Sequence, residues 1–375
     1  MREDRRLLVD RSSVFLLAAA VLFGVSAAVL LLAGASVGVG IATVLGWTTC
    51  ALSAATSRRF KSFGFTLWVL AFGASAWFFP WLYTWSLRGW EPRQAILPLV
   101  QVIMFGMGVT LTFEDFGRVL KMPRAALVGV ACQYVIMPLG AWTFAAAFGL
   151  PSEVAAGLIL IGSCPGGVAS NVIAYIARAN VALSVTMTAC STVLSPLATP
   201  RIMQLLAGQY VPIDVGEMTL GILKMVLLPV LLGLLANRYA HRLVQRLAGV
   251  LPAVAMFSIC VIIAITIALA RADLVVVGLA LFGAAACHNA AGYVLGYGAA
   301  RVVGLDRRDS RTVAFEVGMQ NGGMATGLAL NVLKSPAAAL GSAVFGPWSA
   351  VTSSLLASVW RRSAAPLETT SPEAR

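Results

Sequence analysis

Long apolar segments follow one another along almost the whole chain, and each is bounded by a few polar or charged residues. A helix needs about 20 apolar residues to cross a bilayer, and these segments have that length without the alternation of a barrel strand. The pattern therefore predicts an all-α polytopic membrane protein with twelve spanning segments. They lie near residues 14–34, 37–56, 63–83, 94–112, 125–148, 154–177, 181–206, 217–236, 250–269, 273–300, 312–333 and 336–359.

Composition and charge agree with this class. Of the 375 residues, 59% are hydrophobic and 11% are charged, whereas a soluble protein has about 25% charged residues. The net charge of +12 could indicate a nucleic-acid partner. However, the lysines and arginines fall mainly in loops on the same side as the N-terminus, which the positive-inside rule explains by membrane insertion. We therefore expect no nucleic-acid binding, cytoplasmic N- and C-termini, and a place in the inner (cell) membrane.

A charged linker, SRRFKS at 57–62, separates two helices from the ten that follow. The sequence predicts a two-helix extension at 1–61, a ten-helix transport domain at 62–362, and a polar cytoplasmic tail at 363–375. The extension is interpreted as an accessory anchor or as a contact in a homo-oligomer.

Two apolar segments contain residues that a simple spanning helix avoids. Segment 154–177 is interrupted by GSCPGG at 162–167, and segment 312–333 carries Glu316 and QNGG at 320–323. Proline removes a backbone donor and glycine loosens a helix, so both segments are predicted to unwind. Without the N-terminal pair they are the fourth and ninth of ten helices, equivalent positions in two five-helix halves. This placement is typical of secondary transporters built from inverted repeats.

Glu316 is the one acidic residue that lies well inside an apolar segment. A carboxylate at membrane depth needs a cation or a proton, and no lysine or arginine is predicted at the same depth. Neutral oxygen-bearing side chains in the same segments could complete a cation site: Gln133, Ser170, Asn171, Ser184, Thr188, Ser191 and Gln320. One carboxylate with many neutral oxygens favours a monovalent ion, and sodium fits best. A protonated Glu316 and hydroxyls bonded to their own helices remain the alternatives.

Several stretches resemble the bile acid:sodium symporter family. The long ones are GLILIGSCPGGVASNVIAYIARANVALSVTMTACSTVLSPLATP (157–200) and FEVGMQNGGMATGLAL (315–330), and the shorter ones include HNAAGYVLG (288–296). The resemblance covers about residues 62–362. It implies ten helices in inverted repeats, a panel domain and a core domain, two broken helices that cross, and two sodium ions.

The resemblance also implies the roles of particular residues. One sodium site would contain Ser170, Asn171, Ser184, Thr188 and Glu316. The other would contain Gln133, Glu316, Gln320 and the backbone carbonyls of Val317 and Met319. The substrate would lie beside the crossing, near Gly167, Val168, Ala169 and Asn321. Val168 replaces a threonine that the family often has, and Trp348-Ser349-Ala350 replaces a Trp-His-Asn stretch, so two polar groups are missing here.

These observations predict a sodium-coupled symporter of an organic anion, bile-acid-like or a small carboxylate, that works by alternating access. The sequence leaves open an arsenite-type efflux transporter with Cys164 as a thiolate ligand, a proton-coupled transporter with Glu316 as the relay, and a ligand-gated sensor of the same fold. The chain has no HExxH motif, no paired intramembrane aspartates and no GxSxG elbow beside a histidine. An enzyme is therefore not expected.

Overall fold

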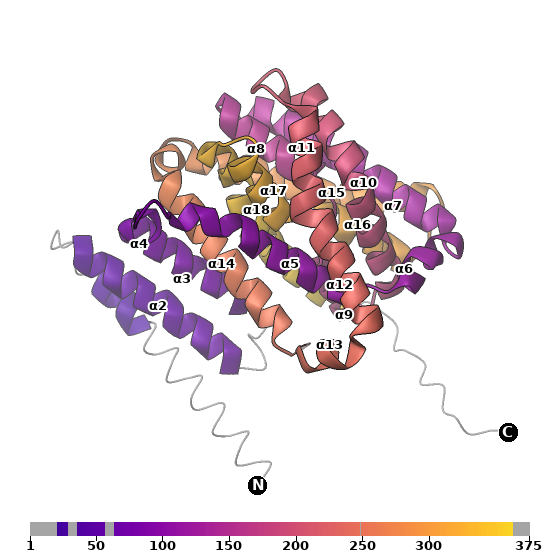
Figure 1. Ribbon diagram of the computed structural model, residues 1–375, viewed down its shortest axis with the longest axis horizontal. Helices are drawn as coiled ribbons and strands as arrows, with labels where there is room; N and C mark the ends of the chain where they lie inside the picture. Colours follow the sequence, from indigo (N-terminus) through magenta and orange to yellow (C-terminus); the bar gives the residue numbers. More distant parts are fainter. Residues whose placement is uncertain (1–20, 29–35, 57–63, 248, 363–375) are drawn as a thin grey trace, which may run out of the picture.

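The computed structural model describes residues 21–28, 36–56, 64–247 and 249–362 (Figure 1). These residues are almost entirely helical, and the extended pairings among them are two isolated bridges, Leu87 with Trp90 and Gly166 with Gln320. Seven helices in the described part are long and apolar enough to cross a membrane. The predicted all-α polytopic membrane fold is therefore confirmed.

The apolar segments of the sequence correspond to the helices of the structure. The part up to residue 207 contains α2 (Ser36–Thr56), α3 (Gly64–Phe78), α4 (Trp81–Thr84), η2 (Pro92–Ala95), α5 (Ile96–Thr110), α6 (Phe113–Gly117), η3 (Arg118–Leu120), α7 (Pro123–Ala147), α8 (Ser152–Ser163), α9 (Ala169–Ile176) and α10 (Val181–Ala207). The part that follows contains α11 (Val215–Ile222), η4 (Leu223–Leu227), α12 (Leu228–Tyr239), α13 (His241–Leu247), α14 (Leu251–Leu269), α15 (Arg271–Val302), α16 (Arg307–Gly318), α17 (Gly322–Asn331) and α18 (Pro336–Arg362).

The segment predicted at 63–83 extends beyond its helix. Helix α3 ends at Phe78, and the short helix α4 follows from Trp81. Pro80 between them lacks a backbone N–H and disfavours helical geometry at the residue before it, so the chain turns here. This turn separates the apolar helix α3 from the loop that contains Trp85 and Trp90.

Both predicted interruptions are present, and the two unwound stretches meet. Helix α8 ends before Pro165, helix α16 ends at Gly318, and the isolated bridge joins Gly166 to Gln320. The Gly167 N–H donates to the Met319 carbonyl at 3.0 Å, and the Asn321 N–H donates to the Pro165 carbonyl at 3.0 Å. Unwound backbone at membrane depth needs such partners because lipid supplies none. We call this paired region, 164–168 and 319–321, the crossover.

The helices form two groups by their contacts. In each group, a contact made in the first five of the ten segments recurs between the segments five places later or earlier in the chain. In one group α5 packs against α12, as α14 packs against α3. In the other, α7 packs against α8 as α15 packs against α16, and α9 contacts α10 as α17 contacts α18. Figure 1 places α3 and α14 toward one end of the molecule and α7 toward the other. The repeated contacts support the predicted pair of five-helix repeats.

The N-terminal extension is described in part. Helix α2 packs against α3, and an added Cβ at Gly40 would lie 2.8 Å from the Phe78 side chain. The small residue therefore allows α2 to approach α3 closely. Residues 21–28 are helical. The rest of the first predicted helix, the linker at 57–62 and the tail at 363–375 lie outside the described residues.

Candidate functional site

Glu316 lies in the last turn of α16, and only 2% of its surface is exposed. The hydroxyls of Ser170 and Ser184 both contact its Oε1 within hydrogen-bonding distance. Thr188 donates to Oε2 at 2.8 Å. Ser170 comes from the first turn of α9, while Ser184 and Thr188 lie one turn apart on α10. Three helices therefore bring neutral oxygens to one carboxylate.

Asn171 completes this group, since its Oδ1 accepts a hydrogen bond of 2.8 Å from Ser184. All five residues predicted for the first sodium site are thus brought together, and we call them the Glu316 cluster. Ser191, which shares a helical face with Ser184, instead donates to the Thr188 carbonyl at 3.2 Å. The back-bonding alternative therefore describes Ser191, whereas Ser184 and Thr188 point to Glu316.

Two hydroxyls of the Glu316 cluster each face two acceptor oxygens. The Ser170 hydroxyl faces both the Gly167 carbonyl and Glu316. The Ser184 hydroxyl faces both Asn171 Oδ1 and Glu316. Each hydroxyl carries one proton and can donate only once. Some of these acceptor oxygens therefore receive no proton. A hard cation would satisfy them, because such cations bind oxygen ligands of this kind.

The ligand types also limit which cation fits. Among the described residues no group of three His, Cys, Asp or Glu side chains could hold a metal ion, and no ion pair involves Glu316. Transition metals favour imidazole or thiolate, and divalent oxygen sites recruit more carboxylates. A single carboxylate with hydroxyls and an amide is suited to a monovalent ion.

The residues predicted for the second sodium site also lie together, but their polar atoms are already paired. Gln133 on α7 donates to Gln320 Oε1 at 2.6 Å and to the Cys164 carbonyl at 2.8 Å. Gln320 donates to the Val317 carbonyl at 2.6 Å. The Met319 carbonyl accepts from the backbone of the other broken segment. Within the described residues, no hydrogen bond joins Glu316 to either glutamine, so this group is an amide pair beside the Glu316 cluster.

Of the predicted substrate residues, Gly167, Val168 and Asn321 belong to the crossover and Ala169 follows it directly, and their exposure differs. Gly167 is buried, and its N–H is used in the crossover pairing. Val168 is half-buried and Ala169 is exposed. Asn321 caps α17 by accepting from the Met324 N–H at 3.0 Å, and its Nδ2 lies 3.6 Å from the Met104 sulfur on α5. Ala169 and Val168 are therefore the accessible members of this set.

The sequence analysis did not predict two contacts of the site. An added Cβ at Gly166 would lie 2.6 Å from Glu316 Oε2, so any side chain there would displace the carboxylate. The Met104 sulfur contacts the Asn321 amide, and no sequence signal distinguishes Met104 from the apolar residues around it in α5. On α15, Asn289 donates to the Gly318 carbonyl at 2.8 Å and so holds the end of α16. His288 likewise contacts the Met137 carbonyl at 2.8 Å.

A second acidic side chain, Asp115, is also buried, with 4% exposed. It lies in the short helix α6, where it forms an ion pair with Arg118 and accepts from the Thr112 N–H at 2.7 Å. The positive charge three residues away explains its burial. Asp115 therefore does not share the unpaired condition of Glu316.

Two discontinuous helices that meet around a buried carboxylate and neutral oxygens define a secondary transporter. The sequence model of the Sodium Bile acid symporter family matches residues 97–287. A sodium-dependent transporter of Bacillus subtilis, YocS, is 37% identical over 298 residues, which are 80% of this chain and 91% of that protein. The chain belongs to the sodium bile acid symporter family, whose members are transporters and not enzymes.

Other relatives extend across distant organisms. A probable sodium/metabolite cotransporter of the Arabidopsis thaliana chloroplast, BASS1, is 39% identical over 273 residues, 73% of this chain and 68% of its own length. The human ileal sodium/bile acid cotransporter is 32% identical over 229 residues, 60% of this chain and 65% of its own length. Their names indicate sodium coupling with different substrates, so membership of the family supports sodium-coupled transport across a membrane.

Proposed function

We propose that this protein carries an organic anion across the membrane together with two sodium ions. The two helix groups would move relative to each other and expose the crossover alternately to each side. No chemical bond is made or broken in this cycle. The observation that carries the proposal is the buried Glu316 carboxylate, which three neutral hydroxyls contact. Within the part of the chain that the structure describes, no basic side chain forms an ion pair with it.

The first sodium ion would bind in the Glu316 cluster. Burying an uncompensated carboxylate in the membrane is unfavourable by at least several kcal/mol, and a bound cation removes that penalty. The hydroxyls of Ser170 and Ser184 would turn their lone pairs to the ion, and Asn171 would offer its carbonyl oxygen. The two hydroxyls that each face two acceptor oxygens support the assignment.

The second sodium ion would bind between Gln133, Gln320, Glu316 and the carbonyls of Val317 and Met319. Because the two amides now donate to each other and to backbone carbonyls, ion binding would require them to turn their oxygens inward. The hydrogen bonds that now join the two amides to each other and to the backbone carbonyls would therefore form only after the ion has left. Ion binding and the geometry of the broken helices would be coupled in this way.

The charge balance supports an anionic substrate. Two sodium ions and one ionised Glu316 leave one positive charge, which a monoanion would neutralise for passage through a medium of low dielectric constant. The substrate would lie near Gly167, Val168, Ala169 and Asn321, where α9 and α17 begin, because helix N-termini favour anions. The names of the relatives, which mention bile acid or metabolites, point to an organic anion.

The surroundings of the protein follow from the same architecture. We propose that the chain lies in the cell inner membrane with both termini in the cytoplasm, which the distribution of basic loops supports. Helix α2, which packs against α3 at the edge of the described structure, would provide the contact in a homo-oligomer. Cross-linking in liposomes of the full chain and of a chain starting at residue 62 would test that contact.

Uptake into proteoliposomes tests the transport proposal directly. The full chain is reconstituted, and a panel of labelled monoanions, among them a bile acid and small carboxylates, is offered with a sodium gradient or with choline at the same pH. Sodium-dependent accumulation of one anion is the expected result. Equal uptake in choline would contradict sodium coupling. If a pH gradient then drives that uptake, the transporter is proton-coupled. Saturable binding without accumulation would indicate a sensor.

A further inference from the structure

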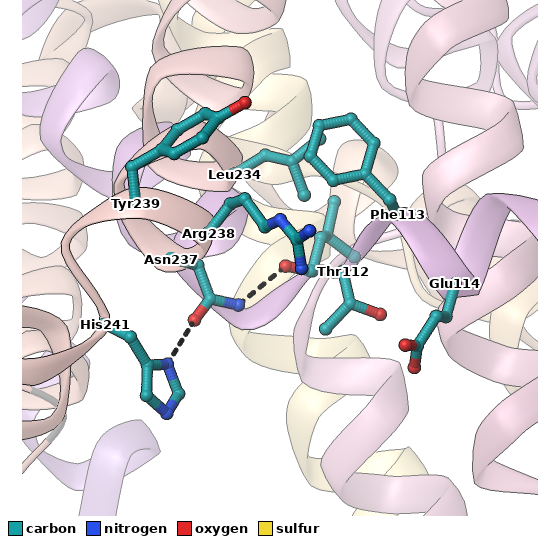
Figure 2. A pocket seen from close by; sticks show the side chains of 9 residues that line it. Thr112, Phe113, Glu114, Leu234, Asn237, Arg238, Tyr239 and His241 are labelled. Atoms are coloured by element: carbon teal, nitrogen blue, oxygen red, sulfur yellow. Dashed lines mark hydrogen bonds between the residues drawn. The ribbon is translucent and has the colours of Figure 1, made fainter.

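A cavity of about 570 Å³ lies away from the crossover, where α5 and α12 end (Figure 2). Its wall includes Thr112, Phe113, Glu114, Arg238 and Tyr239. None of the residues of the Glu316 cluster or of the crossover lines it. A pocket of this size accommodates a small ligand or a lipid headgroup.

The cavity lies at the level where a membrane protein meets lipid headgroups. The spanning segments Pro92–Thr110 and Val215–Tyr239 both end at its wall. Phe113 is 54% exposed and Tyr239 is 82% exposed. Exposed aromatic side chains at the ends of spanning helices are typical of the interface between bilayer and water.

A chain of hydrogen bonds fixes one wall of the cavity. Asn237 donates to the Leu111 carbonyl at 2.9 Å, and His241 Nδ1 lies 3.3 Å from Asn237 Oδ1. The Gln245 amide nitrogen lies 3.0 Å from His241 Nε2. These contacts hold the His241 ring in the wall of the cavity.

The wall of the cavity contains one arginine, Arg238, and one carboxylate, Glu114. Both are exposed, and within the described residues neither forms an ion pair or a side-chain hydrogen bond. In Figure 2 the Arg238 side chain extends toward Thr112, and the Glu114 carboxylate lies on the other side of Thr112. One positive and one negative group, held apart, are complementary to a ligand that carries both charges.

We propose that this cavity binds the zwitterionic headgroup of a phosphatidylethanolamine lipid. The Arg238 guanidinium would hold the phosphate through two parallel hydrogen bonds, and the primary ammonium would donate to Glu114. The lipid backbone would pass over Phe113 and Tyr239 toward the bilayer. A choline headgroup has no N–H to donate to Glu114. A phosphatidylglycerol headgroup has no positive charge to pair with Glu114.

Lipid competition on the full chain tests this proposal. The purified protein is placed in nanodiscs of defined lipids, and native mass spectrometry measures how strongly phosphatidylethanolamine, phosphatidylcholine and phosphatidylglycerol are retained. Phosphatidylethanolamine should be retained about tenfold better than the other two, which corresponds to one hydrogen bond between charged groups. Equal retention, or preferential retention of phosphatidylglycerol, would overturn the proposal.

Three variants separate the two contacts. Glu114→Gln should abolish the preference for ethanolamine over choline, while Arg238→Gln should weaken both about tenfold. Arg242→Gln is the matched control, since Arg242 is exposed on α13 and does not line the cavity. If Arg242→Gln weakened lipid retention as much as Arg238→Gln, the lipids would be attracted by the basic surface in general and not bound in the cavity. Because the replaced side chains are exposed, folding should persist, and the comparison of lipids on the parental chain does not depend on any variant.

Discussion

Thr188 on α10 donates a hydrogen bond of 2.8 Å to the Oε2 atom of Glu316 on α16, although 128 residues separate them in the sequence. The contact joins one helix from each half of the chain. Glu316 also meets Ser170 and Ser184 from the first half. A cation bound here would therefore hold α9, α10 and α16 together, and its loss would loosen all three.

Removing the Thr188 hydroxyl should weaken sodium binding without changing the shape of the helix. We expect Thr188→Val to raise the sodium concentration for half-maximal uptake by roughly tenfold, the effect of one hydrogen bond to a charged group. Thr192→Val is the matched control, because its hydroxyl bonds at 2.7 Å to the Thr188 carbonyl of its own helix. Sodium titrations that coincide for the two variants would place the ion elsewhere.

Removing the charge of Glu316 should remove sodium coupling. We expect Glu316→Gln to lower sodium-driven uptake by roughly 100-fold or more, since breaking a buried charge pair costs about 3–5 kcal/mol. Sodium should also cease to raise the midpoint of thermal unfolding, as it does for a ligand that binds only the folded state. Glu217→Gln, at an exposed position on α11, serves as the control. Uptake by Glu316→Gln at the parental rate with the same sodium requirement would disprove the site.

Adding a methyl group at Gly166, in the crossover, should displace the Glu316 carboxylate by steric contact. The added Cβ of Gly166→Ala would lie 2.6 Å from Glu316 Oε2, whereas a Cβ at Gly106 would meet nothing within 4 Å beyond its neighbours in its own helix. We expect Gly166→Ala to destabilise the protein by about 1–3 kcal/mol through overpacking. Gly106→Ala should leave stability unchanged or raise it by up to about 1 kcal/mol, because alanine favours helix. Thermal unfolding with and without sodium measures both, and a sodium response that survives in Gly166→Ala would argue against the close approach.

Replacing Cys164 tests the arsenite-type alternative. The thiol is fully buried, and the backbone carbonyl of Cys164, not its sulfur, accepts from Gln133. We expect Cys164→Ser to retain sodium-driven anion uptake within about twofold of the parental rate, since no thiolate ligand is required. Cys164→Ala controls for the polarity of the new hydroxyl. Abolished transport in both variants, with folding intact, would favour a thiolate mechanism.

Much of the site could be predicted because its members carry local marks. An acidic residue in an apolar segment, a proline and glycine cluster, and hydroxyls one turn apart are visible in the sequence, so Glu316, 162–167, Ser184 and Thr188 were identified. Gly166 belonged to that cluster, but its direct approach to the carboxylate was not foreseen. The burial of Asp115 was not foreseen either, because it depends on the packing of α6 against α10.

The sequence by itself determined where helices form and where two of them break, since hydropathy, proline and glycine act on the backbone within a few residues. It also determined which chemical groups are available in the membrane. The tertiary structure decided which of these groups meet: the partners of Ser184, the pairing of Gln133 with Gln320, and the cavity beside Arg238. These contacts join segments far apart in the chain, and only the packing of whole helices fixes which of their faces touch.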